Sequence, residues 1–180
     1  YQLRKIIDFI QEGDIDKVNK LIQQGSNNWN EGLRGACWGG HLEIIELMIE
    51  KGANDWNWGL INACRGGHLE ITELMISKGA NDWNWGLNLA CFGGHLEIVN
   101  LMIEKGATNW NDGLRGACRG GHRDFVDLMI ENGATNWDLG LEGACRGEHL
   151  KLCEYIIRYM IKRKIEIPVD YKELEKKIRN

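Results

Sequence analysis

The histidines and cysteines are the residues with the clearest capacity for chemistry, and they recur at one fixed spacing. Imidazole nitrogens and thiolates are the ligands that zinc prefers, and paired thiols can form disulfides. Either chemistry requires a fold that brings these side chains together. The histidines that recur every 27 residues are His41, His68, His95, His122 and His149. The cysteines with the same spacing are Cys37, Cys64, Cys91, Cys118 and Cys145.

A tryptophan follows the same period, so the repetition belongs to the whole chain rather than to one motif. A period of this length, held over five units, is typical of a solenoid in which each unit packs only on its neighbours. The sequence therefore predicts a stack of similar units rather than a compact globule. The tryptophans that define the period are Trp29, Trp56, Trp83, Trp110 and Trp137.

Each unit is predicted to hold two short helices. Asn57 is the expected N-cap of a first helix, in which Leu60 and Cys64 lie on one apolar face. Consecutive glycines end that helix, and a second helix runs from near His68 to Gly79. Both helices are shorter than the roughly 12–15 residues that an isolated helix needs. They must therefore be stabilised by stacking on neighbouring units.

This stacking argues against both metal binding and a disulfide framework. Neighbouring helix pairs lie roughly 10 Å apart, whereas zinc ligands lie about 2 Å from the ion and disulfides need Cα atoms within about 7 Å. We predict no cofactor and no metal. The histidines are expected to bond to the turn backbone of an adjacent unit. The repeated cysteines are expected to be small buried thiols in a reducing compartment, with Cys153 also in the core.

The two ends of the chain depart from the repeat. We predict an amino-terminal capping repeat at 1–27, five 27-residue repeats at 28–162 and a carboxy-terminal capping helix at 163–180. Lys17 and Lys20 replace apolar residues of other units, which is typical of a cap and predicts that little structure precedes it. At the other end, a helix is expected to run past Met160 until Pro168 breaks it. A capping box at 170–173 then predicts a last helix to about Ile178.

The run "ACFGGHLEIVNLMIEKGA" at residues 90–107 resembles the latter part of an ankyrin repeat, and the resemblance recurs along residues 1–162. The family unit has about 33 residues. The 27-residue unit is shorter between "GA" and "GL", where "NDWN" stands in place of the β-hairpin finger of the family. This tryptophan-bearing form is similar to ankyrin-like repeats of giant DNA viruses. The resemblance implies an all-α solenoid of stacked helix-turn-helix repeats without hairpin fingers, with its first helices on the concave side, that binds other proteins.

The first helix varies at the position that holds Gly35, Asn62, Leu89, Gly116 and Gly143, and it has three main positions that differ from unit to unit. The i, i+3, i+7 spacing of the three main positions places them on one helix face, opposite the apolar face, and we call this the variable face. The Trp85 row of this face comprises Glu31, Trp58, Trp85, Asp112 and Leu139. The Asn88 row comprises Arg34, Ile61, Asn88, Arg115 and Glu142. The Phe92 row comprises Trp38, Arg65, Phe92, Arg119 and Arg146.

The variable face is the predicted partner-binding site. A residue that packs against identical neighbours must itself be identical, whereas a residue that meets a nonrepeating partner is free to differ. Tryptophan and arginine are the residues most enriched at binding hot spots. The alternative reading is drift of surface positions that nothing constrains. The residues assigned to the site are Trp38, Trp58, Ile61, Arg65, Trp85, Asn88, Phe92, Arg115, Arg119 and Arg146.

Together these features predict a nonenzymatic scaffold that binds a protein partner, because no unique cluster of catalytic residue types stands apart from the repeat. The face has five arginines and three acidic residues on a chain of net charge −4, so arginines are expected to steer an acidic segment of the partner. The acidic balance disfavours nucleic acid, and no segment is apolar enough for a membrane span. We expect a cytoplasmic monomer, in the host cytoplasm if the source is viral. The alternatives are a self-assembling particle component and a weak binder of single-stranded nucleic acid.

Overall fold

The computed structural model describes residue 10 and residues 12–179, and within them the chain is helical without a β-strand. The predicted all-α solenoid of helix pairs without hairpin fingers is therefore confirmed. Residues 1–9 and 11 of the predicted amino-terminal capping repeat lie outside the described part. The first helices are α3 (Trp29–Gly39), α5 (Trp56–Gly66), α7 (Trp83–Gly93), α9 (Trp110–Gly120) and α11 (Trp137–Arg146). The second helices are α2 (Ile15–Gln23), α4 (Leu42–Glu50), α6 (Leu69–Ser77), α8 (Leu96–Glu104), α10 (Arg123–Glu131) and α12 (Leu150–Lys162).

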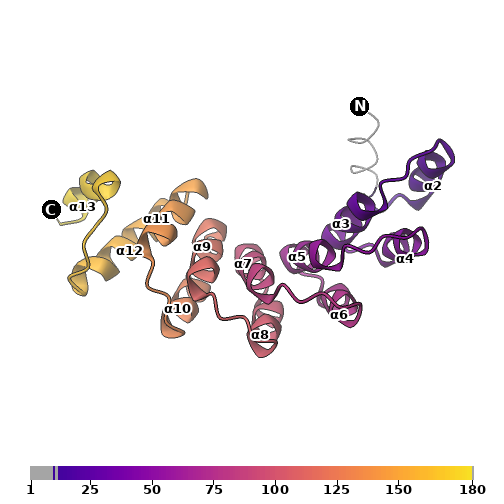
Figure 1. Cartoon of the computed structure of the whole chain (residues 1–180). Helices are drawn as coiled ribbons and strands as arrows, with labels where there is room; N and C mark the ends of the chain where they lie inside the picture. The colour runs from indigo at the N-terminus through magenta and orange to yellow at the C-terminus, as the bar shows by residue number, and fades with distance from the viewer. Residues whose placement is uncertain (1–9, 11, 180) are drawn as a thin grey trace.

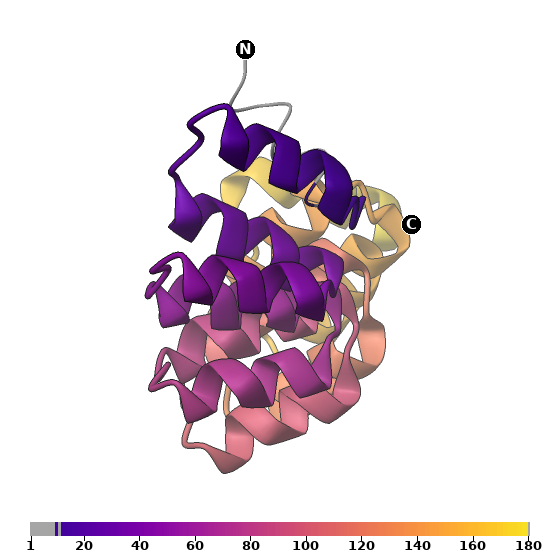
Figure 2. The same ribbon diagram turned by 90° about the vertical axis from the view of Figure 1, so that its right-hand side faces the viewer.

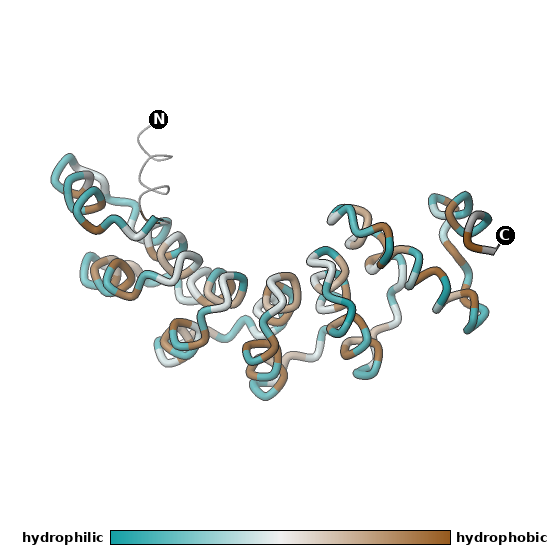
Figure 3. The backbone as a smooth tube through the Cα atoms, turned by 180° about the vertical axis from the view of Figure 1, so that it is seen from behind, coloured by the Kyte–Doolittle hydropathy of each residue, from teal (hydrophilic) through white to brown (hydrophobic). Residues whose placement is uncertain are grey.

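The helix pairs form a curved stack of two layers (Figure 1). The first helices line the inner side of the arc, and the second helices lie on its outer side. A view along the stack shows that the helices of successive units lie in similar orientations, one behind another (Figure 2). Hydrophobic segments lie mainly where helices meet, and hydrophilic residues are common at the turns (Figure 3). Within the described part of the chain, no helix has both the length and the apolar composition needed to span a bilayer.

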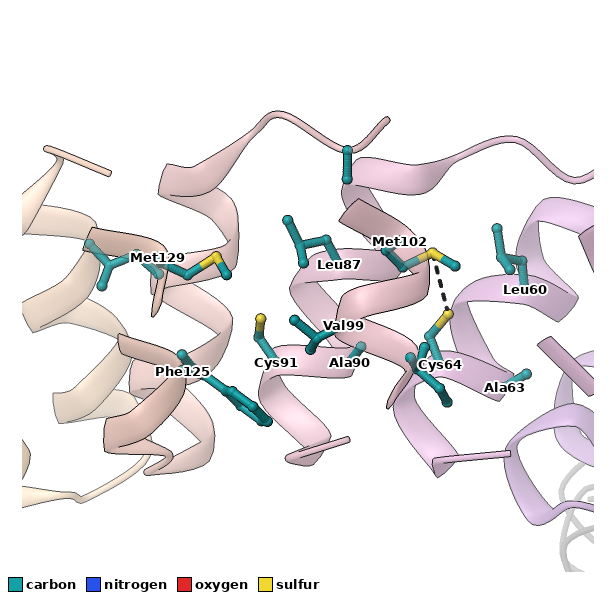
Figure 4. Packing of buried hydrophobic residues seen from close by; sticks show 14 of the residues in the cluster. Leu60, Ala63, Cys64, Leu87, Ala90, Cys91, Val99, Met102, Phe125 and Met129 are labelled. Carbon is teal, nitrogen blue, oxygen red and sulfur yellow. Dashed lines mark hydrogen bonds between the residues drawn. The ribbon is translucent and has the colours of Figure 1, made fainter. Parts of the chain in front are cut away.

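The core is a ladder of the same few side chains, repeated from unit to unit (Figure 4). Each first helix contributes a leucine and an alanine, and each of them except α11 also contributes a cysteine. Leu87 and Cys91 are fully buried in α7. Each of α4, α6, α8 and α10 contributes a buried methionine, such as Met102. The thioether sulfur of Met102 lies 4.0 Å from the thiol of Cys64 in the preceding unit. The core is therefore continuous across the unit boundaries, as a solenoid requires.

A constant glycine in each first helix makes room for that methionine. A Cβ atom placed on Gly86 would lie 2.6 Å from the sulfur of Met102, closer than real Cβ atoms approach. The last unit provides a comparison, because it has Ile156 in place of the methionine in α12. There the nearest atom to a Cβ on Gly140 belongs to Leu114 and lies at 3.4 Å, an ordinary van der Waals distance. The repeated glycine and methionine are thus two halves of one packing arrangement.

The predicted N-cap of the first helix was wrong by two positions. Asp55, not Asn57, caps α5 by accepting a hydrogen bond from the backbone N–H of Trp58. Asn57 lies in the first turn, where its side-chain oxygen accepts from the backbone N–H groups of Asn81 and Asp82, at 2.8 and 3.1 Å. The same pair of bonds to the next loop is made by Asn30, Asn84 and Asn111. A ladder of asparagines therefore joins the short loops that replace the hairpin fingers.

As far as α10, the turns within and after each pair agree with the predicted glycine stops. Gly67 ends α5 in the left-handed conformation, with φ of 82°, and Gly79 follows α6 with φ of 107°. The carboxy-terminal end differs from the prediction in one respect. Helix α12 does run past Met160, but it ends at Lys162, before Pro168 is reached, and Lys164 adopts a left-handed φ of 56°. A 3₁₀ turn, η1 (Val169–Tyr171), then leads into α13 (Lys172–Arg179).

One position that varies between units sets how closely the first helices approach each other. It holds Gly35, Asn62, Leu89, Gly116 and Gly143 in successive units. A Cβ atom on Gly116 would overlap the backbone carbonyl oxygen of Asn88, and one on Gly143 would lie 2.7 Å from that of Arg115. The helices α7, α9 and α11 therefore pack backbone against backbone at these points. A change of residue at this position therefore alters the packing of neighbouring first helices rather than the exposed face.

We expect the Gly116→Ala substitution to destabilise the protein. The added methyl group meets a backbone atom that no rotamer change can move, so the free energy of unfolding should fall by about 1–3 kcal/mol. Gly140→Ala is the matched control, since it also adds a methyl to a buried helical glycine but finds ordinary contact distance. Chemical denaturation of both variants measures the difference. An alanine tolerated equally at both positions would contradict the close helix approach.

Candidate functional site

The variable face lies on the inner side of the arc, and its aromatic side chains are open to solvent. Trp58 and Trp85 are 47% and 53% exposed, and Trp38 is 39% exposed. Phe92 is half-buried. The face is opposite the residues of the first helix that pack on Met102 and its equivalents, so it points away from the second helices. The predicted face therefore exists as a surface, and its exposed tryptophans lie on α3, α5 and α7.

The N-caps fix the backbone from which two of these tryptophans project. Asp55 accepts a hydrogen bond from the N–H of Trp58 at 3.4 Å, and Asp82 accepts from the N–H of Trp85 at 3.3 Å. Both bonds hold the tryptophan at the third position of its helix. Trp58 and Trp85 line one shallow hollow together with Ile61 from the core side. The indole rings of Trp58 and Trp85, from adjacent units, therefore border the same hollow.

Arginine side chains lie over the aromatic rings of neighbouring units. The guanidinium carbon of Arg65 lies 5.8 Å from the ring centre of Trp38 and 5.3 Å from that of Phe92. Arg119 lies 5.4 Å from the same Phe92 ring on its other side. The Phe92 row therefore alternates between aromatic ring and guanidinium over four units. These are cation–π distances, and each contact holds an arginine side chain across a unit boundary.

The first units of the arc contain a polar hollow of about 310 Å³ beside these contacts. It is lined by Trp38 and Trp58, by Arg34 and Arg65, and by Glu31. Arg34 lies over the Trp58 ring at 5.7 Å and forms an ion pair with Glu31 at 2.6 Å. The sequence-based site omits Arg34, although its place in the Asn88 row was a signal that it shares the face. The structure adds it to the site.

Two of the assigned residues do not offer their side chains to a partner. Ile61 is only 5% exposed, and Asn88 is half-buried, with its side-chain nitrogen donating to the backbone carbonyl of Asp112 at 2.6 Å. Both belong to the middle row, which faces the crevice between one first helix and the next. The assignment of Ile61 to the exposed face is therefore corrected, because the row lies too close to the neighbouring helix.

Ion pairs reduce the charge that the face presents. Arg146 pairs with Glu142 in its own helix at 2.7 Å, as Arg34 does with Glu31. Among the described residues, the structure contains no ion pair to Arg65, Arg115 or Arg119. The uncompensated positive charge of the face is therefore centred on α5 and α9 rather than at the carboxy-terminal end.

The repeated residues hold the scaffold that carries the face. Trp83 and its equivalents are half-buried and pack against the core, in contrast to the exposed Trp85. The Nε2 atom of His68 lies 3.0 Å from the carbonyl oxygen of Trp38, and that of His95 lies 3.1 Å from the carbonyl of Arg65. A carbonyl can only accept, so these Nε2 atoms carry the proton. The predicted bonds from histidine to the adjacent turn are confirmed, and they anchor the Phe92 row.

Most of the thiols follow the prediction, but one does not. Cys37, Cys64, Cys91 and Cys118 are buried, and burial raises the pKa of each to about 12. Cys153 is buried in the core as well, whereas Cys145 is exposed, because no further first helix follows α11 to cover it. In the part of the chain that the structure describes, no group of three or more histidine, cysteine or acidic residues could hold a metal ion.

A curved stack of helix pairs with an open inner face defines a solenoid repeat protein. A family model for ankyrin repeats, in three copies, matches residues 6–112. This match covers more than half of the chain, so the protein belongs to the ankyrin repeat family. A comparison with curated proteins found no match.

The roles of the two neighbouring tryptophans can be separated by mutation. We expect Trp83→Ala to lower the free energy of unfolding by about 2–4 kcal/mol, since it removes a large side chain packed on the core. Trp85→Ala should change it by less than about 0.5 kcal/mol, because about half of that residue is exposed and it does not pack on the core cluster. Denaturant unfolding of the two variants provides the measurement. A larger loss from Trp85→Ala would place its ring in the core.

Proposed function

We propose that this protein is a nonenzymatic scaffold that binds a protein partner on the variable face of its first helices. The observation that carries the proposal is the pair Trp58 and Trp85, each about half exposed and lining one hollow. Ankyrin repeats generally mediate protein–protein interaction, and aromatic anchors beside a hollow are the usual energetic centre of such interfaces. Trp38 and Phe92 extend the apolar centre along the arc.

The face is organised before any partner arrives. The backbone under Trp58 and Trp85 is held by the helix N-caps, and the side chains of Arg65 and Arg119 lie against the Phe92 ring. Binding therefore requires little ordering of the scaffold, which lowers its entropic cost. The histidine bonds to the carbonyl groups of Trp38 and Arg65 support the same backbone.

The charge of the face favours an acidic segment in the partner. Within the described part of the chain, no ion pair involves Arg65, Arg115 or Arg119, so a carboxylate of the partner would meet an uncompensated guanidinium. Arg146 contributes less, because Glu142 already neutralises it. Charges of this kind act mainly on association rate and orientation, while the tryptophans supply affinity. The buried free thiols of the repeat are typical of a reducing compartment and support the cytoplasm as the place of action.

The proposal is tested by affinity capture with three forms of the chain. Wild-type protein should retain a partner that the Trp58→Ala/Trp85→Ala double variant loses, and the affinity of the purified partner should fall by about 100-fold or more. Leu96→Ala is the matched control, since Leu96 is an exposed apolar residue of similar exposure at the start of a second helix. It should retain the partner fully. Rising salt should slow association of the partner with wild type.

The opposite pattern would reject the proposal. A partner lost by Leu96→Ala and retained by the double tryptophan variant would place binding at the second helices. The two alternatives have their own readouts on the same samples. A sedimentation mass that rises with concentration would favour self-assembly, and a salt-dependent anisotropy change with single-stranded oligonucleotides would favour nucleic-acid binding.

A further inference from the structure

The last helix pair contains two thiols in contact. The Sγ atoms of Cys145, near the end of α11, and Cys153, in α12, lie 3.4 Å apart across the turn that joins the two helices. Cys145 is exposed, and Cys153 is fully buried. All six cysteines of the chain lie in the described part and are free thiols. This arrangement is independent of the variable face.

The positions of Cys145 and Cys153 recur in the other units, but only the last unit has a cysteine at both of them. Residues eight positions apart also meet in an earlier unit, where the hydroxyl of Thr72 interacts with the thiol of Cys64. The position of Cys153 is held in other units by Ile45, Thr72, Val99 and Val126. Only the last unit places a second sulfur there, and only there is the first sulfur open to solvent. A reagent can therefore reach the Cys145 thiol from solvent, and the buried Cys153 thiol is in contact with it.

We propose that Cys145 and Cys153 form a modification site that reacts with low-molecular-weight disulfides, such as oxidised glutathione, and closes to an intrachain disulfide between α11 and α12. A disulfide has its sulfur atoms about 2 Å apart. From 3.4 Å, the two side chains need to close a gap of little more than about 1 Å between them. The position that brings Thr72 to Cys64 in an earlier unit thus holds a second thiol in the last unit, where a bond can form.

The reaction proceeds in two exchange steps. The thiolate of Cys145 attacks one sulfur of the small disulfide, forms a mixed disulfide and releases one small thiolate. The thiol of Cys153 then loses its proton to solvent, attacks the Cys145 sulfur and expels the second small thiolate. Two protein thiols are oxidised by two electrons in total, and one small disulfide is reduced to two small thiols.

The surroundings of the two sulfur atoms explain why Cys145 reacts first and Cys153 second. Burial, with a smaller contribution from the neighbouring Cys145, raises the pKa of Cys153 to about 12, so the first attack comes from the exposed Cys145. Once Cys145 is in the mixed disulfide its thiol is gone, and with it that contribution to the pKa of Cys153. Tyr171 of η1 interacts with Cys145, and burial raises its own pKa to about 12. Its phenol is therefore neutral at physiological pH, and it places the carboxy-terminal segment beside the pair.

The test treats the folded full chain with excess oxidised glutathione, alkylates the remaining thiols and determines masses of the intact and digested protein. We expect the loss of two of the six free thiols, a mass decrease of two hydrogen atoms before alkylation, and a linked peptide pair containing Cys145 and Cys153. Dithiothreitol should reverse the change. Cys37, Cys64, Cys91 and Cys118 should be recovered as free thiols, because they are buried.

Two variants keep the test decisive. Cys153→Val installs the residue that stands at this position in α8 and α10, so the fold is retained, and glutathione should then remain on Cys145 as a stable mixed disulfide. Cys145→Ser removes the exposed thiol and should leave Cys153 unmodified. A wild-type chain that stops at the mixed disulfide, resists modification at Cys145, or forms a disulfide between two chains instead would overturn the proposal.

Discussion

The structure depends on the packing of one methionine into the space above one glycine. Neither helix of a unit is long enough to be stable alone, so each unit must be held by contacts within the pair and across to the next. Met102 fills the site that Gly86 leaves open and also reaches Cys64 of the preceding unit. The same arrangement repeats through α4, α6, α8 and α10. The spacing between the two helices of each of these pairs, and with it the support of the open inner face, rests on this packing.

Repetition within the chain was the strongest guide to the fold. A residue present in every unit meets an identical environment in every unit, and the half-buried Trp83 and the bonded His68 and His95 agree with that reasoning. This reasoning identifies a residue as structural, but it does not identify the residues that its side chain contacts. Asn57 was recognised as a residue of the loop–helix junction, yet its oxygen serves the next unit rather than its own helix. A local capping rule cannot detect a contact whose other half lies 24 residues away.

The converse rule, that varying positions lie on the surface, holds only in part. It places Trp58, Trp85 and Trp38 in solvent correctly. It fails for Ile61, which the adjacent helix buries, and for Gly116, where the varying residue sets the distance between two backbones. The spacing i, i+3, i+7 identifies a helix face but contains no information on how close the next helix approaches. The spacing also could not predict which arginines of the face are neutralised. The ion pairs of Arg34 and Arg146 depend on side-chain geometry.

The asparagine ladder has a consequence for how such a chain can change its length. Asn84 bonds to the loop that follows it through backbone N–H groups, which every residue type except proline provides. The approach of a helix glycine to the cysteine of the preceding unit also recurs at successive boundaries, as Gly59 lies against Cys37 and Gly86 against Cys64. A duplication or deletion of one whole 27-residue segment would therefore rejoin compatible surfaces and leave the interior almost unaltered. The order of arginine and aromatic side chains along the Phe92 row would change at once. Gene rearrangement could thus produce new binding surfaces without a new fold.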